Sequence, residues 1–425
     1  MFIKISSISF TEFIRYVLRS KLLILGIIIY TTFNISALGP HWYDFFFFGS
    51  SIHHCCIGLD FYQIPNAAYA LFHGGDLTGR LPDGVIQYSQ NYMTNSNAYH
   101  PILTIVIGVF FILFSPDISI NLWLVIKIFI TLAAVYYIFR EFKDNKYLNL
   151  ALFLFLINFS QYNDIKISQY QFIFNIFLLF FLINLAKNKN KLNGGILFFF
   201  TLISKPISLL WIPILFIKRR YSVLCTGLVL FTTSTLTFNI LGLGRYFTDN
   251  IFYHMLTPMQ TKNIDFMSFE AILRNSFGFS MEAIKILKII VLTTIYLISI
   301  PRRISMIKII FLLTLYFLFF YDLLFQYHFS VLGPLLSVCL LTLPEFQTKL
   351  SRILIVITNM PNAFFIFRLF KIGIISNPTL GTDPTFQTQQ IISILQFVPI
   401  IILVAVVLIP DMKYYLQILR KYVSS

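Results

Sequence analysis

The stretch LLILGIIIYTTF, residues 22–33, decides the fold class of this chain. It contains no charged residue, and the segment before it is basic, with Arg15, Arg19 and Lys21. Similar apolar runs recur along the chain as far as IILVAVVLIP at 401–410. A helix of about 20 apolar residues crosses the hydrocarbon core of a bilayer. The repeated runs therefore predict an all-α polytopic membrane protein.

The composition of the 425-residue chain agrees with this class. Hydrophobic residues make up 57% of it and charged residues 12%, whereas soluble domains carry about 25% charged residues. The 32 Lys and Arg residues outnumber the 17 Asp and Glu residues, which would suit nucleic-acid binding. The cations, however, lie at the ends of apolar runs, where they act as cytoplasmic anchors. We expect one integral-membrane domain over residues 1–425 and no nucleic-acid partner.

The distribution of Lys and Arg orients the predicted spans. The first span, 22–38, leads outward because the region 39–100 contains one cation, Arg80, and four acids. The apolar segment 102–114 covers only about 20 Å as a helix, short of a core of about 30 Å. We expect it to lie at the outer leaflet without crossing, and the next span, 120–139, to run inward.

Alternation of the later runs predicts a bundle of about 12 transmembrane helices with both termini in the cytoplasm. The large first outer loop then contains juxtamembrane helices. An outer loop is expected around 371–390. The remaining predicted spans of the first half are 148–160, 171–186, a pair of short helices within 194–217, and 221–241.

The polar residues that are hardest to explain as anchors gather on the outer side of this topology. Because acids, histidines and aromatic residues concentrate there, we expect the functional site there. In chain order these residues are Asp60, His73, Asp76, Tyr99, His100, Asp164, Gln169, Arg245, His254, Ser268, Glu270, Arg274, Asp322, Gln326 and His328.

Asp60 is the most informative of these residues. No Lys or Arg lies within 15 residues on either side of it, and Phe61 and Tyr62 follow it. Carboxyl groups at the edge of an apolar layer are suited to act as bases, because burial disfavours their charged form. The residue chemistry alone leaves a structural role for Asp60 open. Asp76 lies in a Gly-rich segment and is expected to be a turn residue.

Three further features each have a structural interpretation beside a functional one. Lys205 precedes Pro206 at a helix break, where it can neutralise freed carbonyls or meet a phosphate. Arg274 can anchor an interfacial helix, and Lys127 is expected to snorkel toward the outer interface. The run HHCC at 53–56 does not have the separated ligand pairs of structural zinc sites. We therefore predict no metal site and no cofactor.

Several segments, taken in order, resemble the GT-C glycosyltransferases, and most of all glycosyltransferase family 87. That family contains polyprenol-phosphate-mannose-dependent mannosyltransferases. The similar segments are LDFYQIPNAAYALFHGGDL, an Asp-Phe segment; YHPILTIVIGVFFILFSPDISINLW, a Tyr-x-Pro segment; SQYQF, with Ser168 and Gln171 at the Gly and Asn of a Gly-Gln-x-Asn pattern; SKPISLLWIP; MSFEAILRNSFG; and FQYHFSVLGPLL, which retains the second His of a His-His pair as His328.

The resemblance implies a chemistry for these residues. Asp60 would be the general base of an inverting sugar transfer from a polyprenyl-phosphate donor to a lipid or glycan acceptor at the outer face. A lipid monophosphate leaving group does not call for a metal. The implied donor phosphate-binding residues are His328, Lys205 and Arg274, in that order. The implied substrate-binding residues are Tyr62, Tyr99, His100, Gln169 and Ser268.

Two alternatives remain at the level of sequence. A transporter or flippase of lipid-linked sugars would carry charged residues near mid-membrane, reachable from both sides, whereas the polar residues here are biased to one face. A GT-C enzyme of another family would share the same chemistry. Release of free polyprenyl phosphate distinguishes transfer from transport. The resemblance also implies a bacterial cytoplasmic membrane, in which membrane lipids surround the protein.

Overall fold

The computed structural model describes residues 10–38, 60–89, 97, 99–158, 160–161, 170–249, 269–301, 303–321, 326–359, 374–377, 381–384 and 386–423. Three of the described helices are long and apolar enough to cross a membrane, namely Pro116–Phe142, Tyr221–Ile240 and Ile394–Lys413. Shorter apolar helices of 10–17 residues accompany them. The chain is thus a helical integral membrane protein, and the number of about 12 spans stays a prediction.

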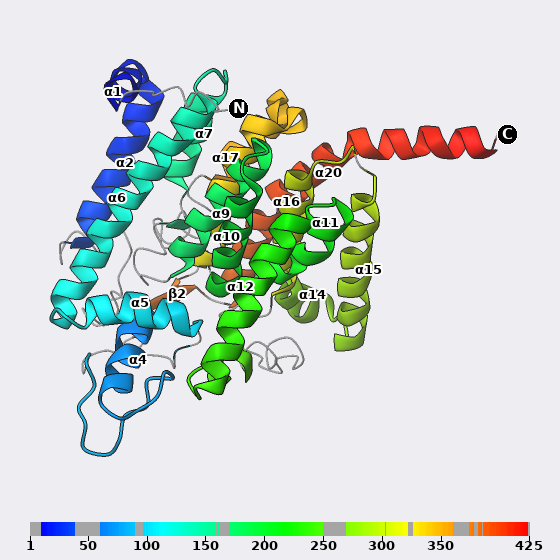
Figure 1. Ribbon diagram of the computed structural model, residues 1–425. Helices are drawn as coiled ribbons and strands as arrows, with labels where there is room; N and C mark the ends of the chain where they lie inside the picture. Colours follow the sequence, from blue (N-terminus) through cyan, green and yellow to red (C-terminus); the bar gives the residue numbers. More distant parts are fainter. Residues whose placement is uncertain are drawn as a thin grey trace.

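The first half of the chain forms the part of the molecule that carries Asp60. In Figure 1, α2, α6 and α7 run together along one side, and α4 and α5 lie at their lower end. The bounds are α1 Phe10–Arg19, α2 Lys21–Leu38, α4 Gln63–Phe72, α5 Pro101–Phe111, α6 Pro116–Phe142, α7 Leu148–Ile157, α9 Gln171–Ala186, α10 Lys191–Ser204, the 3-10 helix η2 Pro206–Trp211, α11 Ile212–Ile217 and α12 Tyr221–Ile240.

The second half packs on the other side of α9 and α10. There α15, α16 and α20 lie along one another, with α14 beside their lower ends (Figure 1). The bounds are α14 Phe269–Phe277, α15 Met281–Ser299, α16 Met306–Phe320, η3 Gln326–Val331, α17 Leu332–Thr342, η4 Pro344–Gln347, α18 Lys349–Asn359, β1 Ile374–Asn377, β2 Gly381–Pro384 and α20 Phe386–Val423.

Apolar run length predicted the helix bounds well. The predicted span 171–186 coincides with α9, and 22–38 agrees with α2 to within one residue. The predicted pair within 194–217 is present, because α10 ends at Ser204 and the chain continues after Pro206 through η2 and α11. Proline has no amide hydrogen for the helix ladder, which explains a break at this point.

The structure adds detail to the outer loop predicted around 371–390. Part of the outer loop predicted around 371–390 is an antiparallel hairpin, in which Ile374 pairs with Pro384 and Asn377 with Gly381. The helix α20 then begins at Phe386. Its first turns include Gln387, Gln389 and Gln390. These polar residues interrupt the apolar pattern and favour a loop assignment from sequence. Glutamine is nevertheless a good helix former, so the helix begins before the apolar run.

The helix α5 is held flat against α4 by a small residue. Figure 1 shows α5 crossing the long axes of the neighbouring helices, an orientation that suits a helix that does not cross the membrane. A Cβ added at Gly108 would lie 2.5 Å from Cβ of Ala68 and 2.8 Å from the carbonyl oxygen of Ile64. Small residues let helix backbones approach this closely. The small residues of α4, among them Ala68, therefore allow α4 to pack closely on α5.

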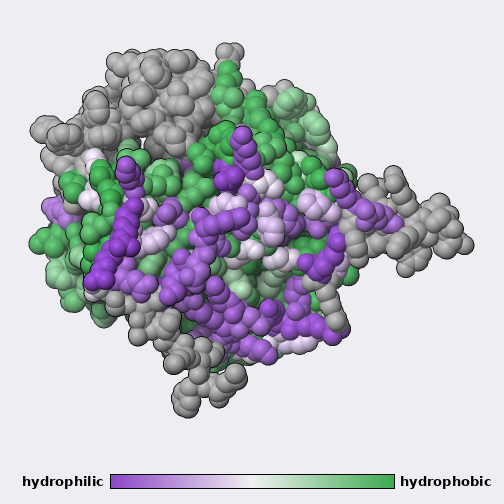
Figure 2. All heavy atoms as spheres, turned by 90° about the horizontal axis from the view of Figure 1, so that it is seen from above, coloured by the Kyte–Doolittle hydropathy of each residue, from purple (hydrophilic) through white to green (hydrophobic). Residues whose placement is uncertain are grey.

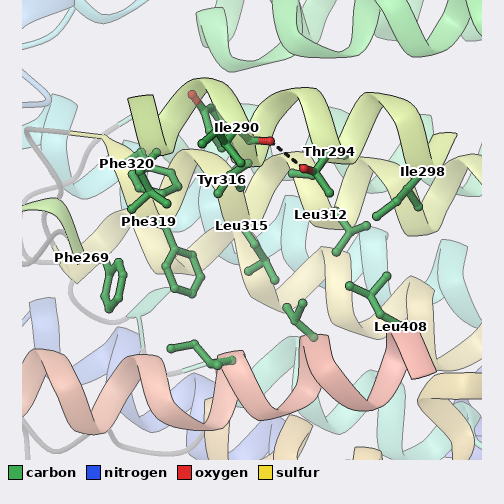
Figure 3. A pocket seen from close by; sticks show the side chains of 15 residues that line it. Phe269, Ile290, Thr294, Ile298, Leu312, Leu315, Tyr316, Phe319, Phe320 and Leu408 are labelled. Atoms are coloured by element: carbon green, nitrogen blue, oxygen red, sulfur yellow. Dashed lines mark hydrogen bonds between the residues drawn. The ribbon is translucent and has the colours of Figure 1, made fainter. Parts of the chain in front are cut away.

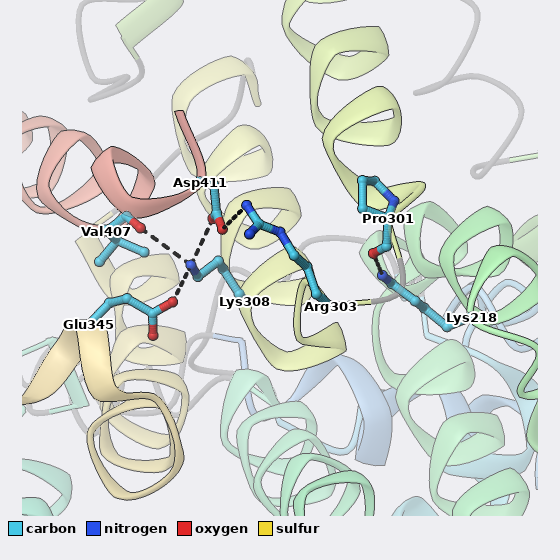
Figure 4. A network of polar contacts seen from close by, with 7 residues as sticks. All are labelled: Lys218, Pro301, Arg303, Lys308, Glu345, Val407 and Asp411. Carbon is cyan, nitrogen blue, oxygen red and sulfur yellow. Dashed lines mark hydrogen bonds and ion pairs between the residues drawn. The ribbon is translucent and has the colours of Figure 1, made fainter. Parts of the chain in front are cut away.

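The opposite end of the molecule is polar and basic. Figure 2 looks onto this end and shows hydrophilic residues over much of the face, flanked by hydrophobic ones. Lys308 is only 2% exposed there, and its Nζ lies 2.5 Å from Oε1 of Glu345 and 2.8 Å from Oδ2 of Asp411 (Figure 4). The Arg303 guanidinium approaches the other oxygen of Asp411 at 3.8 Å. This cluster joins α16 to η4 and α20.

Candidate active site

Asp60 is buried and held by the first turn of the helix that follows it. Its side chain is 6% exposed. The Nε2 of Gln63 donates a hydrogen bond of 2.8 Å to its Oδ1. Because Gln63 is the first residue of α4 and α4 is packed on α5, the carboxylate has a defined direction. A base needs this kind of positioning to meet an acceptor hydroxyl.

An aromatic cluster fixes the main chain next to Asp60. Phe61 and Tyr62 are completely buried, and the Tyr170 hydroxyl donates a hydrogen bond of 2.9 Å to the carbonyl oxygen of Phe61. The Tyr62 hydroxyl donates to the carbonyl oxygen of Pro116 at 3.0 Å. The Tyr99 ring lies 5.1 Å from the Tyr170 ring. The structure therefore brings two predicted substrate-binding residues, Tyr62 and Tyr99, into the cluster beside Asp60.

A buried lysine lies against the same cluster. Lys127 was expected to snorkel to the interface, but its side chain is 2% exposed. Its Nζ lies 5.5 Å from the ring centre of Trp123 and 5.6 Å from that of Phe172. Cation–π attraction and burial keep it inside the protein. The expectation failed because the Phe172 ring, which comes from the distant helix α9, joins the Trp123 ring and offers the ammonium group a site within the bundle.

His100 is engaged on both ring nitrogens. Its Nδ1 accepts a hydrogen bond of 3.2 Å from the amide of Ile102, and its Nε2 lies 3.2 Å from Oγ1 of Thr235 on α12. The ring packs at 4.8 Å against Phe247. Burial lowers the pKa of His100 to about 4, because the charged imidazolium would lose its hydration. His100 thus caps α5 and ties it to α12, and its substrate-binding role remains a prediction.

A chain of buried polar groups leads from the helix of His328 to Tyr170. His328 is 4% exposed, in η3, and its ring contacts that of Tyr321 at 5.4 Å. Two residues on, Oγ of Ser330 accepts a hydrogen bond of 2.8 Å from Nδ2 of Asn175. Oδ1 of Asn175 accepts one of 2.9 Å from Nε2 of Gln171. The sequence contains a signal for these hydrogen bonds. Gln171 and Asn175 are polar residues four apart in an otherwise apolar helix, and such residues lie on one face.

Lys205 and Arg274, the other predicted phosphate-binding residues, are half-buried on elements that surround α16. Lys205 has extended backbone between α10 and η2, and η2 packs on α16. Arg274 belongs to α14, which also packs on α16. The Phe317 ring near the end of α16 lies 6.2 Å from the His328 ring. The three residues therefore come from elements that converge on one helix.

The remaining predictions have separate outcomes. Asp76 is a turn residue as expected, because its Oδ1 accepts hydrogen bonds from the amides of Thr78 at 2.8 Å and Arg80 at 3.3 Å. Gln169 and Ser268, predicted to bind substrate, lie outside the described residues, as does the HHCC run. Within the described ranges, no group of three or more His, Cys, Asp or Glu side chains is placed to hold a metal ion.

Helices long enough to span a bilayer define the class of this chain as a membrane protein, and Asp60 is a buried carboxylate that Gln63 orients. The model of glycosyltransferase family 87 matches residues 98–343. The chain belongs to glycosyltransferase family 87, a family of the GT-C type, and is a membrane glycosyltransferase. The match includes His100, Lys205, Arg274 and His328 and begins after Asp60. No curated protein matches the chain.

Proposed function

We propose that this glycosyltransferase transfers a sugar, mannose or another hexose or a pentose, from a polyprenyl-phosphate donor to a lipid or glycan acceptor. The reaction takes place at the outer face of a bacterial cytoplasmic membrane, with both termini in the cytoplasm. The observation that carries the proposal is the buried carboxylate of Asp60, which Gln63 orients at the start of α4. It lies in the segment predicted to be outside.

In the proposed mechanism, Asp60 is the general base. Its carboxylate removes the proton from the acceptor hydroxyl while the hydroxyl oxygen attacks the anomeric carbon from the side opposite the phosphate. The bond between the anomeric carbon and the phosphate oxygen breaks, and the polyprenyl phosphate leaves with the bonding electron pair. One displacement inverts the anomeric configuration. The aromatic cluster of Phe61, Tyr62 and Tyr170 keeps the base in place.

The leaving phosphate gains negative charge and needs cations or hydrogen-bond donors. His328, Lys205 and Arg274 are the residues proposed to supply them, because their elements converge on α16. Tyr99, His100, Gln169 and Ser268 stay candidates for substrate contacts. A monophosphate leaving group requires no divalent cation in this scheme, so transfer should persist in excess EDTA.

Purified protein in liposomes with a radiolabelled polyprenyl-phosphate sugar and a membrane glycolipid extract as acceptor tests the proposal. We expect release of free polyprenyl phosphate. Asp60→Asn should lower kcat at least about 10²–10⁴-fold, the usual contribution of a general base, with donor binding retained. His328→Ala should raise the donor KM as well, because it removes a ground-state contact.

Asp76→Asn is the matched control, since Asp76 holds a turn through its own backbone contacts. It should leave kcat nearly unchanged. Near-wild-type turnover by Asp60→Asn would show that another group is the base. Movement of the labelled donor across the bilayer without cleavage would instead identify a flippase.

A further inference from the structure

A slot separates α15 and α16 from α20. Its volume is about 420 Å³, within the range of about 300–1,000 Å³ that is usual for ligand sites. Figure 3 shows Leu312, Leu315 and Phe319 around it, with Phe269 at one end and Leu408 and Ile298 at the other. We call this space the α15–α20 slot.

The slot is long and runs parallel to the helices. Its wall on α15 extends from Leu287 to Ile298. Eleven residues of α-helix cover about 16 Å, which is about half of a hydrocarbon core of about 30 Å. A ligand in this space therefore lies along the helices, as a lipid chain does.

The side chains that line the slot are almost all apolar. Thr294 and Tyr316 are the polar side chains among its lining residues. The Thr294 hydroxyl already donates a hydrogen bond of 2.7 Å to the carbonyl oxygen of Ile290 (Figure 3). Ile290 and Ile401, on two edges of the slot, are exposed. In a membrane protein such exposed edges face lipid, so a hydrocarbon chain can enter sideways.

One end of the slot reaches the predicted phosphate-binding residues. Phe319, in the slot, lies 5.3 Å from the Phe269 ring at the start of α14, the helix that carries Arg274. Phe397 on α20 contacts the Phe319 ring at 4.8 Å and the ring of Phe329, the residue after His328, at 5.6 Å. A phosphate at His328 would therefore lie near this end of the slot.

We propose that the α15–α20 slot binds the part of the donor's polyprenyl chain next to the phosphate. This inference rests on the proposed function. An isoprene unit adds four chain bonds of about 1.5 Å, or about 5 Å when extended. A slot of about 16 Å thus holds the first three units, and the rest of the chain lies in the bilayer. The slot therefore contacts only the isoprene units nearest the phosphate, and donor affinity should not depend on the total length of the polyprenyl chain.

Photo-cross-linking of the purified wild-type protein tests the location directly. The probe is a farnesyl phosphate with a diazirine on its terminal isoprene unit. We expect labelled peptides from α15, α16 or α20, and loss of label when unlabelled undecaprenyl phosphate competes. Label on α5, label that undecaprenyl phosphate does not displace, or equal displacement by phosphatidylglycerol would each overturn the proposal.

A pair of tryptophan variants on α15 tests the consequence for transfer. Thr294→Trp fills the slot from its exposed edge, whereas Ile289→Trp adds the same side chain on a surface that is 65% exposed and outside the slot. We expect Thr294→Trp to raise the donor KM about tenfold with kcat little changed, and Ile289→Trp to match wild type. Equal KM values for the two variants would contradict the proposal that the α15–α20 slot binds the polyprenyl chain.

Failure of the slot proposal and failure of the proposed function give different results. If the wild-type protein transfers sugar from a polyprenyl-phosphate donor but Thr294→Trp behaves as wild type and the label lies elsewhere, only the slot is wrong. If wild type releases no polyprenyl phosphate, the proposed function fails, and the cross-linking result still decides whether the slot binds an isoprenoid chain.

Discussion

At the scale of single residues, Asp60 combines two properties that a general base needs, direction and protection from water. Gln63 supplies the direction through its 2.8 Å hydrogen bond, and burial supplies the protection. Asp60 could be singled out from sequence because no Lys or Arg lies near it along the chain, and its role as a base stays a prediction. Gln63 could have been predicted as its partner, since residues three apart in a helical turn are neighbours.

Gln63→Met tests this positioning role, because methionine keeps the length and removes the donor. A hydrogen bond to a charged group contributes about 1.5–3 kcal/mol, and about 1.4 kcal/mol is tenfold in rate. We expect kcat to fall about 10–100-fold while the donor KM and the melting temperature stay near wild type. A variant that lost only thermal stability would assign Gln63 to the fold alone.

His100 makes the folded state sensitive to acid. Its pKa is lowered from 6.5 to about 4 by burial, so the unfolded chain binds more protons between these pH values. The stability that neutral His100 contributes is present above about pH 6.5 and is lost as the pH falls toward 4. The shift corresponds to about 3 kcal/mol.

We expect the difference in melting temperature between wild type and His100→Asn to shrink steadily from pH 7 to pH 4, because Asn can still cap α5 but does not titrate. A difference that is constant with pH would mean that His100 is protonated without cost. The partner of His100, Thr235, is 135 residues away, so this contact could not be predicted from the sequence, and a role of His100 in substrate binding stays a prediction.

At the scale of elements, the long apolar runs were predicted with their bounds, because chain length against bilayer thickness determines them. The contacts between elements were not. Lys308 lies near the start of the apolar helix α16 and is the centre of a buried cluster with Glu345 and Asp411, two residues far from it along the chain. Its Nζ also donates to the carbonyl oxygen of Val407 at 3.3 Å, so it holds α20 at two points.

Lys308→Met should therefore destabilise the protein. Removal of one member of a buried ion pair costs about 3–5 kcal/mol, because the partners stay buried without their counter-charge. We expect a clear fall in melting temperature in detergent, and partial recovery in Lys308→Met with Asp411→Asn. Lys285→Met, on the exposed face of α15, is the control and should melt as wild type. A melting temperature that Lys308→Met leaves unchanged would contradict the role of the cluster.

At the scale of the whole molecule, the proposed function depends on which side of the membrane carries Asp60. Two features of the sequence predict the outer side, the scarcity of cations in 39–100 and the basic cluster at the end of α6. The structure bears on a related question, whether α5 crosses the membrane. The helix α5 lies across the bundle with α4 on it (Figure 1), and its 11 residues cover about 16 Å, too short for a core of about 30 Å.

Cysteine labelling decides this topology. In a background without the four native cysteines, a single cysteine is placed at Ser115, between α5 and α6, or at Asp117, in the first turn of α6, and both positions are exposed. If α5 does not cross, both positions are on the same side as Asp60. We expect a membrane-impermeant maleimide to label them in intact cells, and a cysteine at Lys143, after α6, to be labelled only after the membrane is opened.

Ser115 and Lys143 lie at opposite ends of α6, so the sides from which they are labelled show the direction in which α6 crosses the membrane. Labelling of Ser115 from the cytoplasmic side alone, with labelling of Lys143 from outside, would mean that α5 crosses the membrane and that α6 runs outward. The end of the molecule that carries Lys143 would then face outward, against the distribution of Lys and Arg. A helix of 11 residues would also need a bilayer thinned by about half to span it, and the low energetic cost of lying flat is the physical reason to expect the opposite result.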